Sequence, residues 1–483
     1  MINFLEKKIN IYHYIILSLI FTFPLILADM FFRDDISRAL FYNVGLSRLG
    51  RPLADFVYSI LTGFSAGADL SPLPLLLSSL ALAFTAFIFG RILFEKTNVI
   101  TLVSSIPIII SPFFLQNLSY KYDCLPMSLG LLFSIIPFII TKRSLYGVIF
   151  PICSIIVSIS FYQVSINVFI TIAISLFTIS ILRNGISYKD IKIALWRMVQ
   201  LIIAILLYYI TIVPLFLSKI GEDRSNVASL NEVINNITRL NQDVMTLSTH
   251  YMSYIYIILI CLFIINVIFL SFSGNKNFLS SLSLILITLI STVLSYLMIG
   301  GVSLILKEGI SGYRAYVSFG FFCSFVFFII LNGTRNIQFR LFEFIIASLI
   351  CIYFISYSYA YGNSIKSQRA YEYHILDNVF FYLSSIENIS NKVVFTSGEI
   401  KIAPLSLPFN KFNKTIINQN ENTQWMPRFL LSSYGINIDW KWGTYEDLRK
   451  KAKNNELKVI VRNDNFIIYE IDKDKILVLF TSL

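Results

Sequence analysis

Two adjacent aspartates and an arginine follow the first long apolar run of the chain. The run is Ile11–Leu27, and the three side chains are Asp34, Asp35 and Arg38. Ionisable groups this close to lipid are costly and are usually functional. A hydroxyl that attacks an activated sugar needs a carboxylate as general base, and the forked donors of arginine suit a departing phosphate. The segment Phe31–Pro52 therefore indicates sugar transfer beside a membrane.

The spacing of these residues predicts how they pair. If the segment is helical, Asp34 and Arg38 are four residues apart on one face and can form an ion pair. Asp35 then points about 100° away, because an α-helix has 3.6 residues per turn. One aspartate would be held by the arginine while the other faces a different partner. The alternative interpretation is a solvated helix start with a surface salt bridge.

The composition places these residues in a membrane protein. Of 483 residues, 56% are hydrophobic and 14% are charged, whereas about a quarter of a soluble chain is charged. Because about 20 apolar residues span the hydrocarbon as a helix, the sequence predicts a polytopic α-helical membrane protein with about eleven spans. The spans are expected near residues 11–29, 71–94, 98–116, 124–141, 146–161, 164–182, 197–217, 252–271, 279–299, 315–332 and 341–360. The stretch 146–182 is interpreted either as two spans joined by a tight polar turn or as one span and a partial helix.

Short loops between the apolar runs hold much of the net charge of +11. Lysine and arginine in such loops set orientation, and their bias places the N-terminus in the cytoplasm. An odd number of spans then places the C-terminal tail outside. The positive charge thus indicates membrane orientation first and an anionic substrate second, and it disfavours a nucleic-acid partner.

The polar tail predicts a separate domain of small α/β type. Residues 1–361 are expected to form the membrane domain and residues 362–483 the soluble one. Between the first two spans, Arg51–Thr62 is too short to cross and predicts a helix in the interface. Within the tail, a helix is expected over Ser364–Ile389, strands over Lys392–Thr396, Lys414–Ile417, Val459–Val461, Phe466–Glu470 and Ile476–Phe480, and a helix Tyr445–Lys453 capped by Thr444.

Five further polar residues are expected on the outer side, in three places. Lys121 and Asp123 share a short turn with two tyrosines, which predicts acceptor or metal binding, or else an aromatic interfacial turn with a Lys–Asp pair. Gln163 separates two apolar runs; it could bind a sugar hydroxyl, although such a residue more commonly satisfies a neighbouring helix. Tyr313 and Arg314 open a later span, where the arginine could hold a lipid phosphate or extend to the headgroups.

The acidic segment resembles a known family. Its pattern is Asp34-Asp35-x-x-Arg38, followed by Gly50-Arg51-Pro52-Leu53. This is similar to the bacterial and phage O-antigen glucosyltransferases that alter serotype, the Gtr family, which belong to the GT-C class of membrane glycosyltransferases. Many members have tryptophan at the position of Leu49. Multiple spans followed by an outside C-terminal domain also match that family.

The resemblance implies a reaction and a place for it. The donor would be glucose, or another hexose, on undecaprenyl phosphate, and the acceptor an O-antigen or lipopolysaccharide hydroxyl at the periplasmic face of the inner membrane. Transfer would invert the anomeric carbon. Asp34 would be the base with Asp35 in reserve, while Arg38 and Arg51 would orient the acid or bind phosphate. Asp123 resembles the second acid of GT-C enzymes and could bind the acceptor or a divalent cation; no other cofactor is implied.

Two other functions remain open from the sequence. A polymerase or ligase of O-antigen also uses lipid-linked sugars, but such enzymes place basic residues in a large central outside loop, and 221–250 is poor in arginine. A transporter of lipid-linked sugars would be expected to show internal repeats, and none is visible. The sequence has no Walker loop and no G-x-G-x-x-G motif, which disfavours a nucleotide-linked donor.

Overall fold

The computed structural model describes residues 5–64, 67–94, 97–140, 145–218, 226–273, 276–307, 312–333, 336–416, 426–440 and 445–480. These residues form two compact units. The first, here called the membrane unit, comprises Met1–Ile26 and Val44–Tyr359. The second, called the tail unit, comprises Leu27–Asn43 and Ala360–Leu483. The segment that carries Asp34, Asp35 and Arg38 thus belongs to the tail unit.

Seven helices in the described residues are long and apolar enough to cross a membrane, as in a polytopic helical membrane protein. One further candidate is a bent pair, Val99–Ile108 and Pro112–Leu118, whose two parts meet at 43°. The seven helices are α2 (Ile11–Ala28), α5 (Leu73–Leu93), α10 (Ser165–Asn184), α11 (Tyr188–Phe216), α14 (His250–Phe272), α15 (Phe278–Leu297) and α17 (Ile337–Ser384).

The predicted count of eleven spans is not confirmed, although helices occur in all eleven places. Three of the expected spans are short helices: α8 (Cys124–Ile135), which a 3-10 turn extends to Phe138, α9 (Leu145–Phe161) and α16 (Phe319–Gly333). Helix α9 has 17 residues and α16 has 15, fewer than the roughly 20 that span the hydrocarbon. In the bent pair, Pro112 lacks the N–H that a continuous helix would need.

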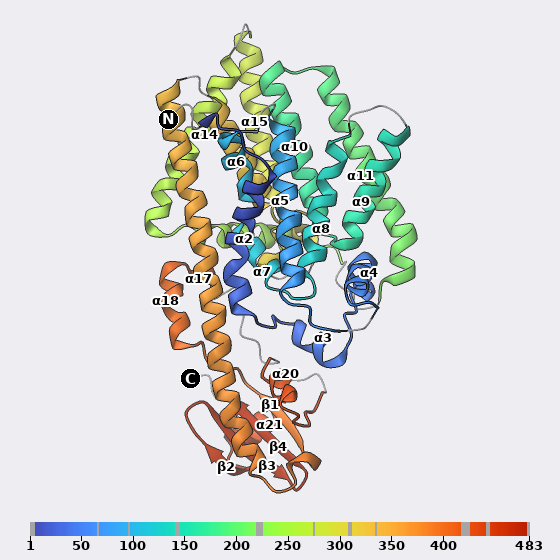
Figure 1. Cartoon of the computed structure of the whole chain (residues 1–483), viewed down its shortest axis with the longest axis vertical. Coiled ribbons are helices and arrows are strands. Elements are labelled where there is room, and N and C mark those ends of the chain that lie inside the picture. The colour runs from blue at the N-terminus through green and yellow to red at the C-terminus, as the bar shows by residue number, and fades with distance from the viewer. Residues whose placement is uncertain are drawn as a thin grey trace. The chain divides into compact units, whose positions relative to one another are not determined.

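Small and hydroxyl-bearing side chains join the helices of the membrane unit. The Ser158 hydroxyl lies 2.8 Å from that of Ser134 and 2.6 Å from that of Ser165, and Thr22 and Ser79 meet at 2.9 Å. Such pairs let helices approach closely where no water is available. Helices α5, α8 and α10 lie side by side through the middle of this unit (Figure 1), whereas α11, α14 and α15 keep many leucine and isoleucine side chains exposed.

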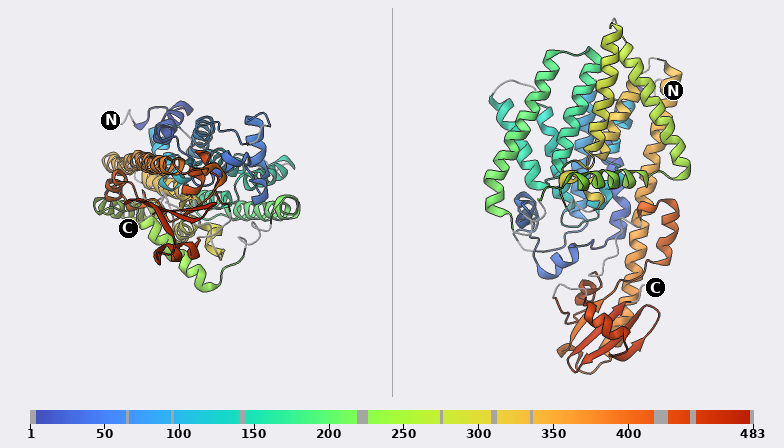
Figure 2. Two further views of the ribbon diagram at one scale, coloured as in Figure 1. Left: turned by 90° about the horizontal axis from the view of Figure 1, so that it is seen from below. Right: turned by 180° about the vertical axis from the view of Figure 1, so that it is seen from behind.

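Two of the helices described in the membrane unit lie outside all eleven ranges predicted as spans. Helix α4 (Pro52–Leu61) confirms the short helix predicted over Arg51–Thr62. Helix α13 (Leu230–Met245) crosses this unit at a steep angle to the long helices (green in Figure 2, right). The Asn236 amide anchors α13 by donating to the carbonyls of Leu304 (3.0 Å) and Leu306 (3.2 Å).

The tail unit is built on a four-stranded sheet with the order β1-β4-β3-β2. Strand β1 pairs in parallel with β4, and the other two pairings are antiparallel. The last turns of α17 cover the sheet through Leu376, Val379 and Leu383. Its strands and short helices are β1 (Val393–Ser397), α18 (Leu407–Phe412), α20 (Met426–Ser433), α21 (Glu446–Lys453), β2 (Lys458–Arg462), β3 (Phe466–Asp472) and β4 (Lys475–Phe480).

The tail differs from its prediction in two places. The helix expected from Ser364 is the continuation of α17, which runs for 48 residues without a break. The strand expected over Lys414–Ile417 is wrong where it is described, because residues 414–416 are helical. The Asn413 side chain begins that turn by accepting the Thr415 N–H at 2.9 Å. Thr444, the expected cap, lies outside the described residues.

Candidate functional site

The acidic segment packs into the tail unit. Helix α3 (Asp35–Phe41) buries Ile36 in the same hydrophobic core as Leu376 and Leu431. The Arg369 guanidinium donates to the Phe31 carbonyl at 2.8 Å. Left-handed backbone at Arg33 (φ 47°) precedes the helix. Such conformations are costly for non-glycine residues and are found at functional sites.

The two aspartates have different environments. Asp35 is fully buried; its carboxylate pairs with the Arg38 guanidinium at 3.5 Å and accepts the Phe32 N–H at 3.3 Å. Asp34 is exposed at the residue before the helix. In the part of the chain that the structure describes, no hydrogen bond or ion pair engages its carboxylate.

The predicted pairing of Asp34 with Arg38 is wrong. Helix α3 begins at Asp35, so Asp34 occupies the N-cap position and its carbonyl, not its carboxylate, binds the Arg38 N–H. Arg38 instead reaches the residue three positions before it. The expected division of roles is kept, with one aspartate held by the arginine and the other facing outward, but the two aspartates are exchanged.

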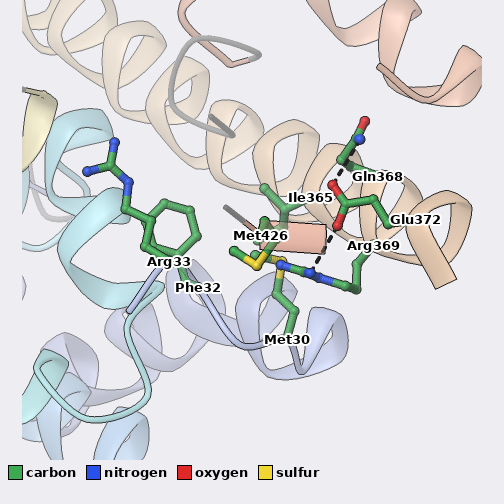
Figure 3. Close-up of a pocket in the computed structure, with 8 residues that line it drawn as sticks. All are labelled: Met30, Phe32, Arg33, Ile365, Gln368, Arg369, Glu372 and Met426. Carbon is green, nitrogen blue, oxygen red and sulfur yellow. Dashed lines mark hydrogen bonds and ion pairs between the residues drawn. The ribbon is translucent and has the colours of Figure 1, made fainter. Parts of the chain in front are cut away.

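A small pocket lies against this segment (Figure 3). Its polar side is Glu372, which accepts from Arg369 at 2.9 Å and from Gln368 at 3.0 Å. Gln368 in turn binds the Lys401 carbonyl and the Ala403 N–H. The sequence interpretation missed these side chains, although their spacing of three and four residues on one helix was a signal. The lining residues are Met30, Phe32, Arg33, Ile365, Gln368, Arg369, Glu372 and Met426.

In the membrane unit, the Gly50-Arg51-Pro52 motif forms a fixed turn. Asp55 accepts the N–H groups of Leu46 (2.9 Å) and Ser47 (2.6 Å) and thereby holds the preceding loop. Gly50 has φ 77°, and its carbonyl accepts from the Tyr208 hydroxyl at 2.6 Å. A Cβ atom at Gly50 would lie 2.7 Å from that hydroxyl oxygen. The glycine is therefore required both for the backbone conformation and for the close approach.

This turn brings Arg51 to Gln163. The Arg51 Nε donates to Gln163 Oε1 at 2.7 Å, and the Gln163 amide donates to the Leu49 carbonyl at 2.6 Å. The Arg51 guanidinium lies over the Tyr162 ring, 4.8 Å from its centre. Gln163 thus binds the glycine-arginine-proline turn, and Tyr208, which the sequence interpretation did not select, closes it from α11.

A second arginine reaches the same tyrosine from another part of the chain. The Tyr162 hydroxyl donates to the Arg314 carbonyl at 2.8 Å, and the Arg314 guanidinium donates to the Tyr120 hydroxyl at 3.2 Å. Burial raises the pKa of Tyr162, and the positive charges of Arg51 and Arg314 oppose that shift. Two cations predicted as phosphate ligands therefore lie within electrostatic range of one buried ring.

The other predicted residues of the membrane unit have contacts of their own, around the arginine cluster that Arg51 and Arg314 form at Tyr162. Lys121 forms an ion pair with Asp69 at 2.8 Å. Asp123 is buried at the start of α8, and its charge also acts on Tyr162. The Tyr313 ring stacks on Phe113 with 5.4 Å between ring centres. In the described ranges, no three histidine, cysteine or acidic side chains are grouped so that they could hold a metal ion.

Comparison with known proteins gives two matches. A family model described as Glucosyl transferase GtrII matches residues 23–331. A stretch of 176 residues is 36% identical to the "Uncharacterized 55.3 kDa protein in gtrB 5'region" of Salmonella phage P22. This stretch covers 35% of the chain and 36% of that relative, so the match spans about a third of the relative's length. No solved structure matches.

The family match confirms the resemblance drawn from the acidic segment. Its range includes every candidate residue named above from the sequence and ends before α17, so it leaves out that helix and all the residues after it. The nine residues are Asp34, Asp35, Arg38, Arg51, Lys121, Asp123, Gln163, Tyr313 and Arg314.

Proposed function

We propose, because this chain belongs to the Glucosyl transferase GtrII family, that it is an inverting membrane glycosyltransferase. Family membership indicates a glycosyltransferase. In our proposal the enzyme moves glucose, or another hexose, from undecaprenyl phosphate to a hydroxyl of O-antigen or lipopolysaccharide. The reaction takes place at the periplasmic face of the bacterial inner membrane, with the N-terminus in the cytoplasm, the tail in the periplasm, and serotype conversion as the outcome.

The exposed carboxylate of Asp34 beside the buried, ion-paired Asp35 is the observation that carries the mechanism. A general base must reach the acceptor hydroxyl and be ionised, and Asp34 is the aspartate of the pair that remains open to a substrate. The acceptor oxygen forms a bond to the anomeric carbon, its proton passes to Asp34, and the bond from that carbon to the phosphate oxygen breaks. The lipid phosphate leaves with the electron pair.

Arg51 and Arg314 are the proposed ligands of the lipid phosphate. Fixed cations stabilise the charge that develops on a departing phosphate, and hydrogen bonds to Gln163 and to Tyr120 orient the two side chains. Lys121 and Asp123 flank this cluster and are proposed to bind the acceptor or, for Asp123, a divalent cation. Arg38 acts indirectly, because its pairing with Asp35 fixes the helix that follows Asp34.

A transfer assay tests this function. Membranes that contain the wild-type protein are supplied with radiolabelled polyprenyl-phosphate-glucose and lipopolysaccharide. We expect label in the polysaccharide, added as one sugar per acceptor site, and none in membranes without the protein. Longer added chains would instead indicate a polymerase. Movement of the lipid-linked sugar across the membrane without a new glycosidic bond, for every hexose supplied, would contradict the proposal.

A further inference from the structure

A cavity of about 730 Å³ lies at the end of the membrane unit where α11 begins. Its volume falls within the range of roughly 300–1,000 Å³ that is usual for ligand pockets. Among the lining residues that the structure describes, Lys189, Lys192 and Arg197 are cationic and none is acidic. The other lining residues are Ile140, Gly147, Val148, Ile193, Leu195, Trp196 and Val199.

Arg197 is the most buried of these three cations, and hydrogen bonds fix its side chain in the cavity wall. Arg197 is 9% exposed. Its guanidinium donates to Gln200 Oε1 at 2.9 Å and to the Ile140 carbonyl at 3.0 Å. These partners are neutral, and no ion pair of Arg197 occurs among the described residues. A buried cation at membrane depth is costly unless an anion or water compensates it.

The two lysines lie nearer the water. Helix α11 has 29 residues and is about 44 Å long, which exceeds the roughly 30 Å of hydrocarbon. Lys189 and Lys192 are exposed in its first two turns, at the level where headgroup phosphates lie. The neighbouring acid, Asp190, is engaged by the hydroxyls of Ser180 (2.7 Å) and Ser187 (2.5 Å) and does not line the cavity.

The lining between these cations is apolar and exposed. Ile193, Leu195, Trp196 and Val199 are all at least 41% exposed, and tryptophan favours the membrane interface. Cations at headgroup level above an apolar wall match a lipid with an anionic headgroup, because its phosphate and its acyl chains are satisfied together. We propose that this cavity binds an acidic phospholipid.

This cavity is separate from the arginine cluster around Tyr162. Both sites adjoin α9, which packs against α11 (Figure 1). The cavity is lined by Gly147 and Val148 near the start of α9, whereas Tyr162 follows its last residue. A helix of 17 residues is about 25 Å long, so the two sites lie at opposite ends of α9. Resting on the proposed function, we assign the lipid to the leaflet opposite the transfer reaction.

Trp196 provides a reporter inside the cavity. The full-length protein in neutral-detergent micelles is titrated with phosphatidylglycerol whose brominated acyl chains quench tryptophan, and with the matching brominated phosphatidylcholine. The other tryptophans, Trp425, Trp440 and Trp442, give a background that a Trp196→Phe variant measures. We expect half-quenching of Trp196 at a lower mole fraction of phosphatidylglycerol than of phosphatidylcholine.

The charge variant decides whether the cavity is responsible. Each basic residue near a membrane surface contributes about fivefold in affinity, so Lys189→Gln/Lys192→Gln raises the half-quenching fraction of phosphatidylglycerol about 30-fold. The same double variant leaves the half-quenching fraction of phosphatidylcholine unchanged. The charge-preserving variant Lys189→Arg/Lys192→Arg keeps the preference for phosphatidylglycerol, which shows that both positions tolerate substitution. The control variant Lys7→Gln/Lys8→Gln, outside the cavity, does not change the half-quenching fraction of either lipid.

Two results would overturn the proposal. One is equal quenching by the two brominated lipids in the wild type, or a preference that survives loss of both lysines. The other is displacement of brominated phosphatidylglycerol by undecaprenyl phosphate at a lower concentration than by unlabelled phosphatidylglycerol, which would assign the cavity to a polyprenyl phosphate.

Discussion

The pairing of Arg38 with Asp35 shows how one of two adjacent carboxylates is removed from solvent. Both side chains of the pair are less than 10% exposed. A buried carboxylate is stable as an anion only with its cation and hydrogen-bond donors in place. The arginine therefore stabilises the start of α3, and the neighbouring Asp34 keeps its carboxylate outside that pair.

Replacing Arg38 by alanine is expected to destabilise the tail unit. The change leaves Asp35 buried without its cation, which costs about 3 kcal/mol. The matched control is Lys458→Ala, which breaks an ion pair of the same unit whose lysine side chain is 78% exposed and should leave the stability almost unchanged, because water screens an exposed pair. Thermal unfolding of the purified variants measures the stability that each substitution removes. Equal losses of stability in Arg38→Ala and Lys458→Ala would mean that the Arg38–Asp35 pair is not buried as described.

A second prediction concerns Gly50. Alanine at this position places Cβ 2.7 Å from the Tyr208 hydroxyl and imposes φ 77° on a non-glycine residue, so Arg51 and Gln163 shift and sugar transfer falls at least tenfold (about 1.4 kcal/mol or more in the barrier). Gly63→Ala is the control, because Gly63 has φ 61° and nothing within 4 Å of its Cβ position. Equal transfer rates in the two variants would show that the close contact with Tyr208 has no role.

At the scale of elements, α17 connects the acidic segment to the tail sheet. Its Arg369 binds the Phe31 carbonyl, its Glu372 holds that arginine, and its later turns cover the sheet. The acidic segment is thus held by α17, whose Arg369 lies 338 residues from Phe31 in sequence, while α3 also packs against α20. Arg369 is a positioning residue in this account.

The double change Arg369→Met/Glu372→Met tests this positioning. Removing both partners avoids an unpaired buried charge, so the protein is expected to fold. Loss of the hydrogen bond to Phe31 loosens the segment before Asp34, and we expect kcat to fall about tenfold while the KM for the lipid donor is unchanged. Lys366→Met, at an exposed position of the same helix, should have no effect. A changed KM with unchanged kcat would place Arg369 in donor binding instead.

Helix α13 carries a titratable contact. Asp243 accepts from the Tyr316 hydroxyl at 2.7 Å, and burial raises the pKa of its carboxyl above the usual 3.8, although Tyr316 and Arg239 oppose this shift. Because the folded state favours the protonated acid, its contribution to stability is complete below pH 3.8 and is lost as the pH rises through the raised pKa.

Asp243→Asn, which mimics the protonated acid, is expected to remove this pH dependence. Near pH 4 the melting temperatures of wild type and variant should agree. As the pH rises toward about 7, the wild type should melt increasingly below the variant. The melting temperature of both proteins across this range is the measurement. A difference that does not change with pH would mean that Asp243 has its ordinary pKa in the folded protein.

For the whole molecule, local patterns predicted the class of fold and the residues of interest. Hydropathy located the helices, and the spacing of Asp34, Asp35 and Arg38 with Gly50-Arg51-Pro52 identified the family. The exchange of partners between Asp34 and Asp35 could not be predicted, because it depends on the left-handed turn at Arg33 that delays the helix start. Hydropathy also located α9 and α16, but helices of 17 and 15 residues are shorter than the roughly 20 residues that span the hydrocarbon, so their prediction as spans is not confirmed.

Contacts between distant parts of the chain were beyond the sequence. Tyr208 meets Gly50 across 158 residues and Tyr162 meets Arg314 across 152, and neither tyrosine differs in its local sequence from other interfacial aromatic residues. The packing of the acidic segment in the tail unit is another contact between distant parts of the chain. That unit lies largely outside the family match, yet the acidic segment packs in its core through Ile36. Reading the tail as a separate domain therefore missed its support of the segment that carries Asp34.

The most direct test of the central claim compares donor binding and sugar transfer in Asp34→Asn. Asparagine keeps the size of the side chain and removes its basicity. If Asp34 is the general base, the purified variant binds polyprenyl-phosphate-glucose as the wild type does, and transfer to lipopolysaccharide falls at least 100-fold. Asp35→Asn is the matched comparison, because it should lower the thermal stability of the protein as well as the rate of transfer. An Asp34→Asn enzyme with full transfer activity would contradict the account.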